Sequence, residues 1–230
     1  MRWFQTLFAV AAAVAPLLGV FLWGWSVQEV VLIYWAENVV IGFWQVVKMG
    51  VAGAGKAIEE GAGTLRKLLF LIPFFTLHYG GFCAGHGSFI LTMTGGGSAQ
   101  VMNDLNPALG PFVFLQLLFG VVQQVFAVLP RESLWSILSI FSLRGLAIWQ
   151  DFVATGEWRR TRPEKLMMEP YRHIFVLHIA IIAGAALVMA FEGAWPLLAI
   201  IVLGKLGLDL FQIWSGKESS DRPRENFDES

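Results

Sequence analysis

Charged residues are scarce in this sequence. Asp, Glu, Lys and Arg make up 14% of the 230 residues, whereas a soluble domain usually contains about 25%. Hydrophobic residues make up 56%, and the mean hydropathy is +0.62. A soluble monomer this apolar would expose large hydrophobic patches, which soluble proteins avoid. The composition therefore excludes a soluble enzyme and a disordered chain, and it indicates a protein embedded in lipid.

Cysteine and excess positive charge are also lacking. Cys83 is the single cysteine, so the chain cannot form an intrachain disulfide, and a disulfide-stabilised secreted scaffold is excluded. Sixteen basic and 17 acidic residues give a formal net charge of -1. Because nucleic-acid binding requires a basic surface, no nucleic-acid partner is expected. The lipid bilayer is the expected partner.

Long apolar segments dominate the chain. A membrane-spanning helix needs about 20 apolar residues. Six segments meet this requirement: 4–25, 28–49, 68–92, 111–129, 172–191 and 194–214. The first is longer than the apolar region of a signal peptide and lacks a clean cleavage site, so we interpret it as a retained helix. The predicted fold class is all-α, a polytopic transmembrane helical bundle over residues 1–216 with a disordered polar cytoplasmic tail at 217–230.

A further segment, 132–154, is apolar but contains Arg144 and Asp151. Its placement depends on the loop charges, because Lys and Arg concentrate in cytoplasmic loops. Basic residues occur in the connections 49–67 and 155–171 and in the tail, and they are missing near residue 26, at 93–110 and at 192–193.

Six spans place every basic connection and both termini in the cytoplasm. We therefore expect 132–154 to lie in the cytoplasmic interface or to dip partway into the bilayer. A bundle of seven spans, in which 132–154 crosses the membrane, is the alternative, but it would export the basic connection 155–171.

Ionisable side chains inside spanning helices are costly, and they are functional candidates by default. Four of them come from four different spans and fall within one slab about 10 Å thick, at a rise of about 1.5 Å per residue. They are Glu37, His78, His178 and Asp209. Two imidazoles and two carboxylates suit Zn²⁺ best, with Fe²⁺ or Mn²⁺ as alternatives. Either carboxylate, Glu37 or Asp209, is also a candidate general base for a metal-bound water.

Four other polar residues are expected to support this site or to contact its substrate: His86, Asn38, Tyr79 and Lys205. The first functional hypothesis is metal-dependent hydrolysis of a lipid-like substrate. The second is a proton- or cation-coupled transporter, in which the same residues form a relay. The third is a structural role without a catalytic site, since buried polar side chains also fasten helices together. The sequence leaves the choice between an enzyme and a non-enzyme open, and it leaves a homodimer open as well.

The segment 76–88 contains four glycines within one span: Gly80, Gly81, Gly85 and Gly87. Small residues let neighbouring helices approach closely, and this is the simpler interpretation. The alternative is that the glycines open space for a substrate or water beside His78 and His86.

Three stretches of sequence carry a resemblance to a known family. They are Tyr-Trp-Ala-Glu-Asn at 34–38, His-Tyr-Gly-Gly-Phe at 78–82 with His86, and Glu-Pro-Tyr at 169–171 through His178, followed by Lys205 and Asp209. Together they resemble an uncharacterised family of small bacterial integral membrane proteins over residues 28–212. The resemblance implies a multi-pass protein of the bacterial inner membrane, and it implies no activity.

Overall fold

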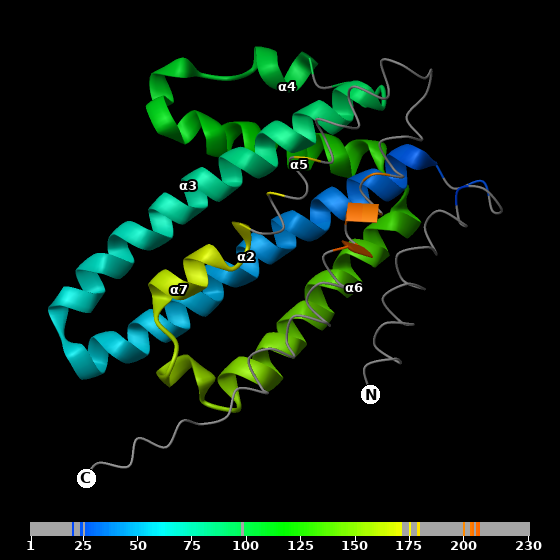
Figure 1. The fold of residues 1–230 in the computed structure, drawn as a ribbon. Coiled ribbons are helices and arrows are strands. Elements are labelled where there is room, and N and C mark those ends of the chain that lie inside the picture. The colour runs from blue at the N-terminus through cyan, green and yellow to red at the C-terminus, as the bar shows by residue number, and fades with distance from the viewer. Residues whose placement is uncertain are drawn as a thin grey trace, which may run out of the picture.

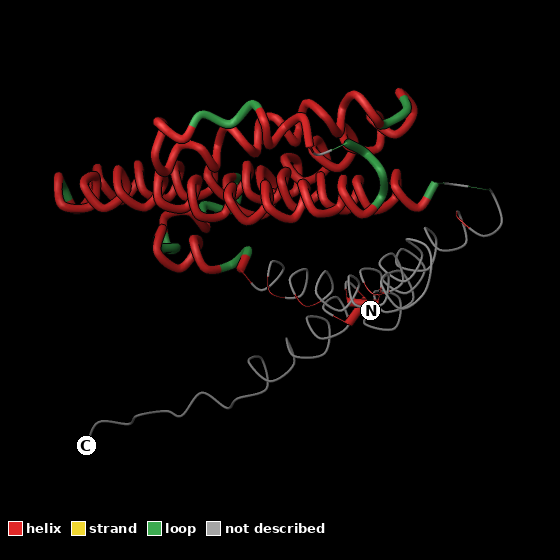
Figure 2. Tube along the Cα trace, turned by 90° about the horizontal axis from the view of Figure 1, so that it is seen from above, coloured by secondary structure: helices red, strands yellow, loops and turns green. Residues whose placement is uncertain are grey.

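The fold is described from a computed structural model. The description covers residues 26–97 and 99–171, together with isolated positions at 20, 24, 175, 179, 200, 203–204 and 206–207. Within these residues every regular element is helical, and none is a strand (Figure 2). The expected all-α class is confirmed for this part of the chain. The predicted spans 4–25, 172–191 and 194–214 and the tail 217–230 fall outside the described residues, except for those isolated positions.

Two long helices form the centre of the bundle. Helix α2 (Val27–Glu60) has 34 residues and α3 (Ala62–Met93) has 32, so each is about 50 Å long. The Ser26 backbone N–H donates a hydrogen bond to the Glu29 carboxylate at 3.1 Å, which caps the start of α2. Gly61 alone separates the two helices, and its φ of 86° is one that glycine adopts without strain. The helices consequently pack as an antiparallel hairpin (Figure 1).

Helix α5 (Val113–Val128) lies beside only half of α3. A Cβ added at Gly81 would lie 3.4 Å from Phe114, at the start of α5. Further along, the Gln124 amide donates a hydrogen bond to the Gly96 carbonyl at 2.8 Å. Helix α5 therefore runs in the same direction as α3, and it begins near the middle of α3 (Figure 1).

The connection between α3 and α5 must therefore run back along half of α3. It contains the short helix α4 (Ala99–Asn103) and the 3-10 segment η1 (Pro107–Phe112). Gln116 of α5 holds it in place, since its side chain donates to the Asp104 carbonyl and accepts from the Asn106 N–H. Residues 94–128 thus form a helical hairpin, which we call the 94–128 hairpin. Both of its ends lie at one end of the bundle, and its tip lies beside the middle of α3.

Helix α6 (Arg131–Ile148) runs alongside α2 in the same direction (Figure 1). Near its start, the Ser133 hydroxyl donates to the Glu29 carboxylate at 3.2 Å. Near its end, the Phe141 carbonyl accepts a hydrogen bond from the Trp44 indole at 3.0 Å. Residues 29 and 44 are separated by about 22 Å of helix. This segment thus lies lengthwise against α2, and its predicted place in the cytoplasmic interface stays a prediction.

The two basic connections lie at the same end of the bundle. The chain continues from α6 through η2 (Trp149–Val153), η3 (Glu157–Arg159) and α7 (Pro163–Met168). A Cβ added at Gly55 would meet the Trp158 ring, and the Lys67 ammonium lies 3.8 Å from the Glu164 carboxylate. We call this the basic end.

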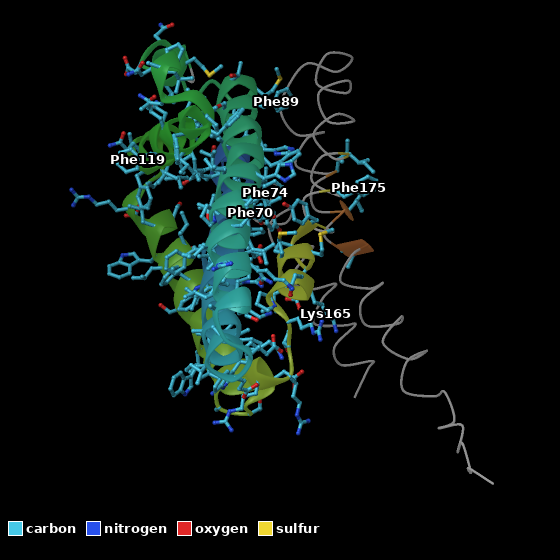
Figure 3. The ribbon with its side chains drawn as sticks, turned by 90° about the vertical axis from the view of Figure 1, so that its left-hand side faces the viewer. Phe70, Phe74, Phe89, Phe119, Lys165 and Phe175 are labelled. Carbon is cyan, nitrogen blue, oxygen red and sulfur yellow. The ribbon has the colours of Figure 1, made fainter. Side chains whose placement is uncertain are left out.

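Within the described residues, three helices are long and apolar enough to cross a membrane: Val27–Glu60, Ala62–Met93 and Pro107–Val128. Many large apolar side chains are exposed on them, among them Phe70 and Phe119, each more than 60% exposed (Figure 3). Exposed phenylalanines on long apolar helices are stable in lipid and unfavourable in water. These features indicate a membrane protein.

Candidate functional site

Glu37 lies about one third of the way along α2 and faces α6. Its Oε1 atom is 3.2 Å from Nη2 of Arg144, and the two side chains are 18% and 38% exposed. An ion pair between two apolar helices compensates part of the desolvation cost of each charge. Arg144 is therefore the partner of the central carboxylate. The sequence marked Arg144 as an unusual charge but not as part of the site.

A second ion pair lies about three helical turns further along α2, toward the basic end. The Lys48 ammonium is 2.7 Å from Oε2 of Glu169, which also accepts a hydrogen bond from the Gln45 amide at 3.1 Å. Gln45 is 5% exposed, and its amide also donates to the Leu166 carbonyl. The Lys48 ammonium lies 5.2 Å from the centre of the Phe152 ring, at a favourable distance for a cation–π contact. The end of α7 is thereby fastened to α2.

A cavity of about 350 Å³ lies between α2, α6, η2 and the end of α7, and we call it the charged cavity. Lys48 and Glu169 both line it, whereas of the Glu37–Arg144 pair only Arg144 does. Four charged residues line it: Lys48, Arg144, Asp151 and Glu169. The lining thus balances two cations with two carboxylates, while Ile41 and Phe152 add apolar surface. A cavity of this size and charge suits a small ion, water or a small zwitterionic solute.

The histidines of α3 occupy a different place. His78 Nδ1 is 3.0 Å from the Tyr171 hydroxyl, and His86 Nδ1 is 2.6 Å from the Phe82 carbonyl. Both imidazoles line a second, mostly apolar cavity of about 730 Å³ between α3 and the tip of the 94–128 hairpin. We call it the histidine groove.

Asn38 and Tyr79 join α2 to α3. The Tyr79 hydroxyl donates to the Asn38 carbonyl at 3.0 Å, and the Asn38 amide donates to the Tyr34 carbonyl at 2.9 Å. Trp35 makes a similar contact, because its indole donates to the Cys83 carbonyl at 2.7 Å. These contacts fit the interpretation that buried polar side chains fasten helices.

The predicted metal set is only half described. Glu37 contacts Arg144 and His78 contacts Tyr171, so these two have different neighbours. His178 and Asp209 lie outside the described residues, as does Lys205. Within the part of the chain that is described, no three His, Cys, Asp or Glu side chains lie close enough to hold a metal ion. The metal set Glu37, His78, His178 and Asp209 remains a prediction.

The four glycines of segment 76–88, all in α3, divide into two groups. A Cβ added at Gly80, Gly81 or Gly87 would touch side chains of α5, and at Gly87 it would lie 2.5 Å from Val121. Close helix packing therefore explains these three. A Cβ at Gly85 meets nothing within 4 Å, and Gly85 lines the histidine groove. The interpretation that glycine opens space beside the histidines is supported at this position alone.

A family model matches residues 1–226, nearly the whole chain, and its description is Family of unknown function (DUF6498). The chain belongs to this family. The resemblance carried by the polar segments is thereby confirmed, and membership in DUF6498 assigns no activity. Comparison with curated proteins found no match, and neither did comparison with solved structures.

Proposed function

We propose that this DUF6498 protein is a multi-pass membrane carrier that moves a proton or a small cation by way of the charged cavity. The observation that carries the proposal is the lining of the charged cavity, where the Lys48–Glu169 ion pair lies together with Arg144, the partner of Glu37. Ionisable groups in membrane helices are rare and costly, and they mark ion pathways and proton relays. A carboxylate that is paired with a basic side chain can leave that side chain and bind a proton or a solute cation. When the proton or the solute cation leaves, the carboxylate can pair with the basic side chain again.

Two features favour a carrier over helix fastening alone. Replacing a buried ion pair by apolar residues of similar size is often neutral or stabilising, so ion pairs are an inefficient way to hold helices together. Four charged side chains also border open space in the charged cavity instead of being sealed by packing: Lys48, Arg144, Asp151 and Glu169. A solute can therefore reach Lys48 and Arg144 without the helices separating.

The proposal includes a path for the chain through the membrane. Helices α2, α3 and α6 each cross the bilayer, and the 94–128 hairpin enters and leaves on one side. With the predicted spans 4–25, 172–191 and 194–214, the chain crosses six times. Both basic connections then lie in the cytoplasm, as the distribution of Lys and Arg favours. An inner-membrane location with both termini in the cytoplasm belongs to the same proposal.

Proton flux into liposomes that contain the purified full-length protein tests this function. With a pH-sensitive dye inside and an imposed pH gradient, we expect the wild-type protein to dissipate the gradient and Glu37→Gln to reduce the rate to that of protein-free liposomes. Glu59→Gln is the matched control, because Glu59 is exposed at the end of α2. Equal flux through wild type and Glu37→Gln, or no flux above that of protein-free liposomes, would overturn the proposal.

Metal-dependent hydrolysis of a lipid-like substrate stays a prediction from the sequence. It would require Glu37 to exchange Arg144 for a metal ion. It would also require His178 and Asp209 to approach His78. We prefer the carrier because it requires Glu37 to lie beside a basic side chain, and Arg144 is that side chain.

A further inference from the structure

The histidine groove runs along α3 for most of one bilayer thickness. Its lining extends from Phe74 to Phe89, a distance of about 22 Å at 1.5 Å per residue (Figure 3). The hydrocarbon core of a bilayer is about 30 Å thick. Pro111 and Phe114, at the tip of the 94–128 hairpin, form its other wall. The groove is therefore long enough to run through most of the hydrocarbon core of a bilayer.

The lining is apolar except at the two imidazoles. None of the ten lining residues is Asp, Glu, Lys or Arg. His78 Nδ1 is engaged by the Tyr171 hydroxyl, and a tyrosine hydroxyl that donates to Nδ1 leaves the proton on Nε2. No described residue makes a hydrogen bond to His78 Nε2, and His78 is an exposed residue on the groove wall. In this tautomer the groove offers one hydrogen-bond donor, His78 Nε2, within an apolar channel.

We infer that His78 carries its proton on Nε2 and that the histidine groove binds one lipid-soluble molecule, whose hydrocarbon chain lies along α3 and whose small uncharged head accepts a hydrogen bond from His78 Nε2. An apolar lining without ionic groups excludes a charged headgroup, because no cation there would offset its desolvation. A purely hydrocarbon chain would leave the Nε2 donor unsatisfied, which is costly in a low-dielectric site. A chain with a carbonyl or hydroxyl oxygen satisfies both requirements. This inference is independent of the proposed transport.

Gly85 provides a direct way to block the groove. An added Cβ there meets nothing within 4 Å, so a leucine side chain starts in open space beside the groove that Gly85 lines. Gly63 is the matched control, since its Cβ is equally free, but it lies at the start of α3 and is exposed at the basic end. Both variants add the same side chain to the same helix.

The test is saturation binding of tritiated hexadecanol to the full-length protein in detergent, measured by scintillation proximity. We expect one saturable site per chain, binding about tenfold weaker in Gly85→Leu, and unchanged binding in Gly63→Leu. His78→Phe, which keeps the ring shape but removes the donor, should weaken binding about fivefold. Palmitate, which has the same chain length and a charged head, should compete poorly.

Three results would overturn the inference. The first is binding that does not saturate, and the second is equal affinity in wild type and Gly85→Leu. The third is a wild-type dimer that Gly85→Leu converts to a monomer in light scattering, because the groove would then be an interface between two copies of the chain. An unchanged elution profile of Gly85→Leu would show that the variant folds, so its loss of binding would report on the groove.

Discussion

Replacing Gly87 by leucine is expected to lower the free energy of unfolding by about 3 kcal/mol or more, the upper range for overpacking in a well-packed core. An added Cβ at this position would lie 2.5 Å from Val121 and 2.6 Å from the indole ring of Trp35. Trp35 cannot move aside easily, because it is 2% exposed and its indole donates to the Cys83 carbonyl. Helices α2, α3 and α5 meet at this point, so a larger side chain must push at least two of them apart.

Unfolding in detergent by increasing sodium dodecyl sulfate, followed by tryptophan fluorescence, measures this effect. Gly85→Leu is the control, since it adds the same side chain two residues away, where the Cβ meets nothing within 4 Å. We expect its unfolding midpoint to stay close to that of the wild type. Similar midpoints for the two variants would show that α5 does not pack against α3 as described.

Replacing Arg144 by methionine is expected to cost about 2–3 kcal/mol, less than the loss of one partner from a fully buried pair, because the side chain is partly exposed. The substitution removes the cation that lies 3.2 Å from the Glu37 carboxylate and keeps most of the side-chain volume. A carboxylate in the middle of an apolar helix is then left with less compensation for its lost hydration.

Glu37→Gln should rescue the Arg144→Met variant, because it removes the charge that the arginine compensates. In a double-mutant cycle we expect the two substitutions to be non-additive by at least about 1 kcal/mol, a typical coupling energy for residues in contact. Arg131→Met is the control, since Arg131 is exposed at the start of α6 and should stay within about 0.5 kcal/mol of the wild type. Additive effects of Glu37→Gln and Arg144→Met would contradict the ion pair.

The central helices could be predicted from apolar runs, but their lengths could not. The sequence predicted spans 28–49 and 68–92, and the helices extend over Val27–Glu60 and Ala62–Met93. Hydropathy detects the part of a helix that matches the hydrocarbon thickness. The segment between these spans is rich in Ala and Gly and in short polar runs, and it continues both helices beyond that thickness until Gly61 reverses the chain.

The path of the chain after α3 could not be read from hydropathy. Segment 111–129 is apolar enough to cross a membrane, yet α5 packs beside one half of α3 and returns to the same end of the bundle. Segment 132–154 is apolar but contains Arg144, and the loop charges placed it in the interface; in the structure α6 lies along α2. The desolvation cost of Arg144 is offset by the Glu37 carboxylate, about 100 residues away in the sequence. Hydropathy along the sequence does not detect such a pair.

The candidate site could be predicted only in part, because it also depends on pairs of residues that are far apart in the sequence. Glu37 and His78 were identified because a charge or an imidazole inside an apolar run is costly. Lys48 and Glu169 were missed as site residues, because each lies at the edge of an apolar run, where a charge is common and carries little signal. Only the packing of α7 against α2 brings them together at 2.7 Å.

The most direct test of the account is the side of the membrane on which each end of α6 lies. In a Cys83→Ser background, Glu132→Cys and Glu157→Cys place one exposed thiol before and one after the segment that carries Arg144. In intact spheroplasts, the account predicts that a membrane-impermeant maleimide labels Glu132→Cys, and that it labels Glu157→Cys only after the membrane is permeabilised. Two results would contradict a membrane-crossing α6 beside Glu37. Protection of both thiols is what an interfacial helix requires, and labelling of Glu157→Cys alone is what seven spans require.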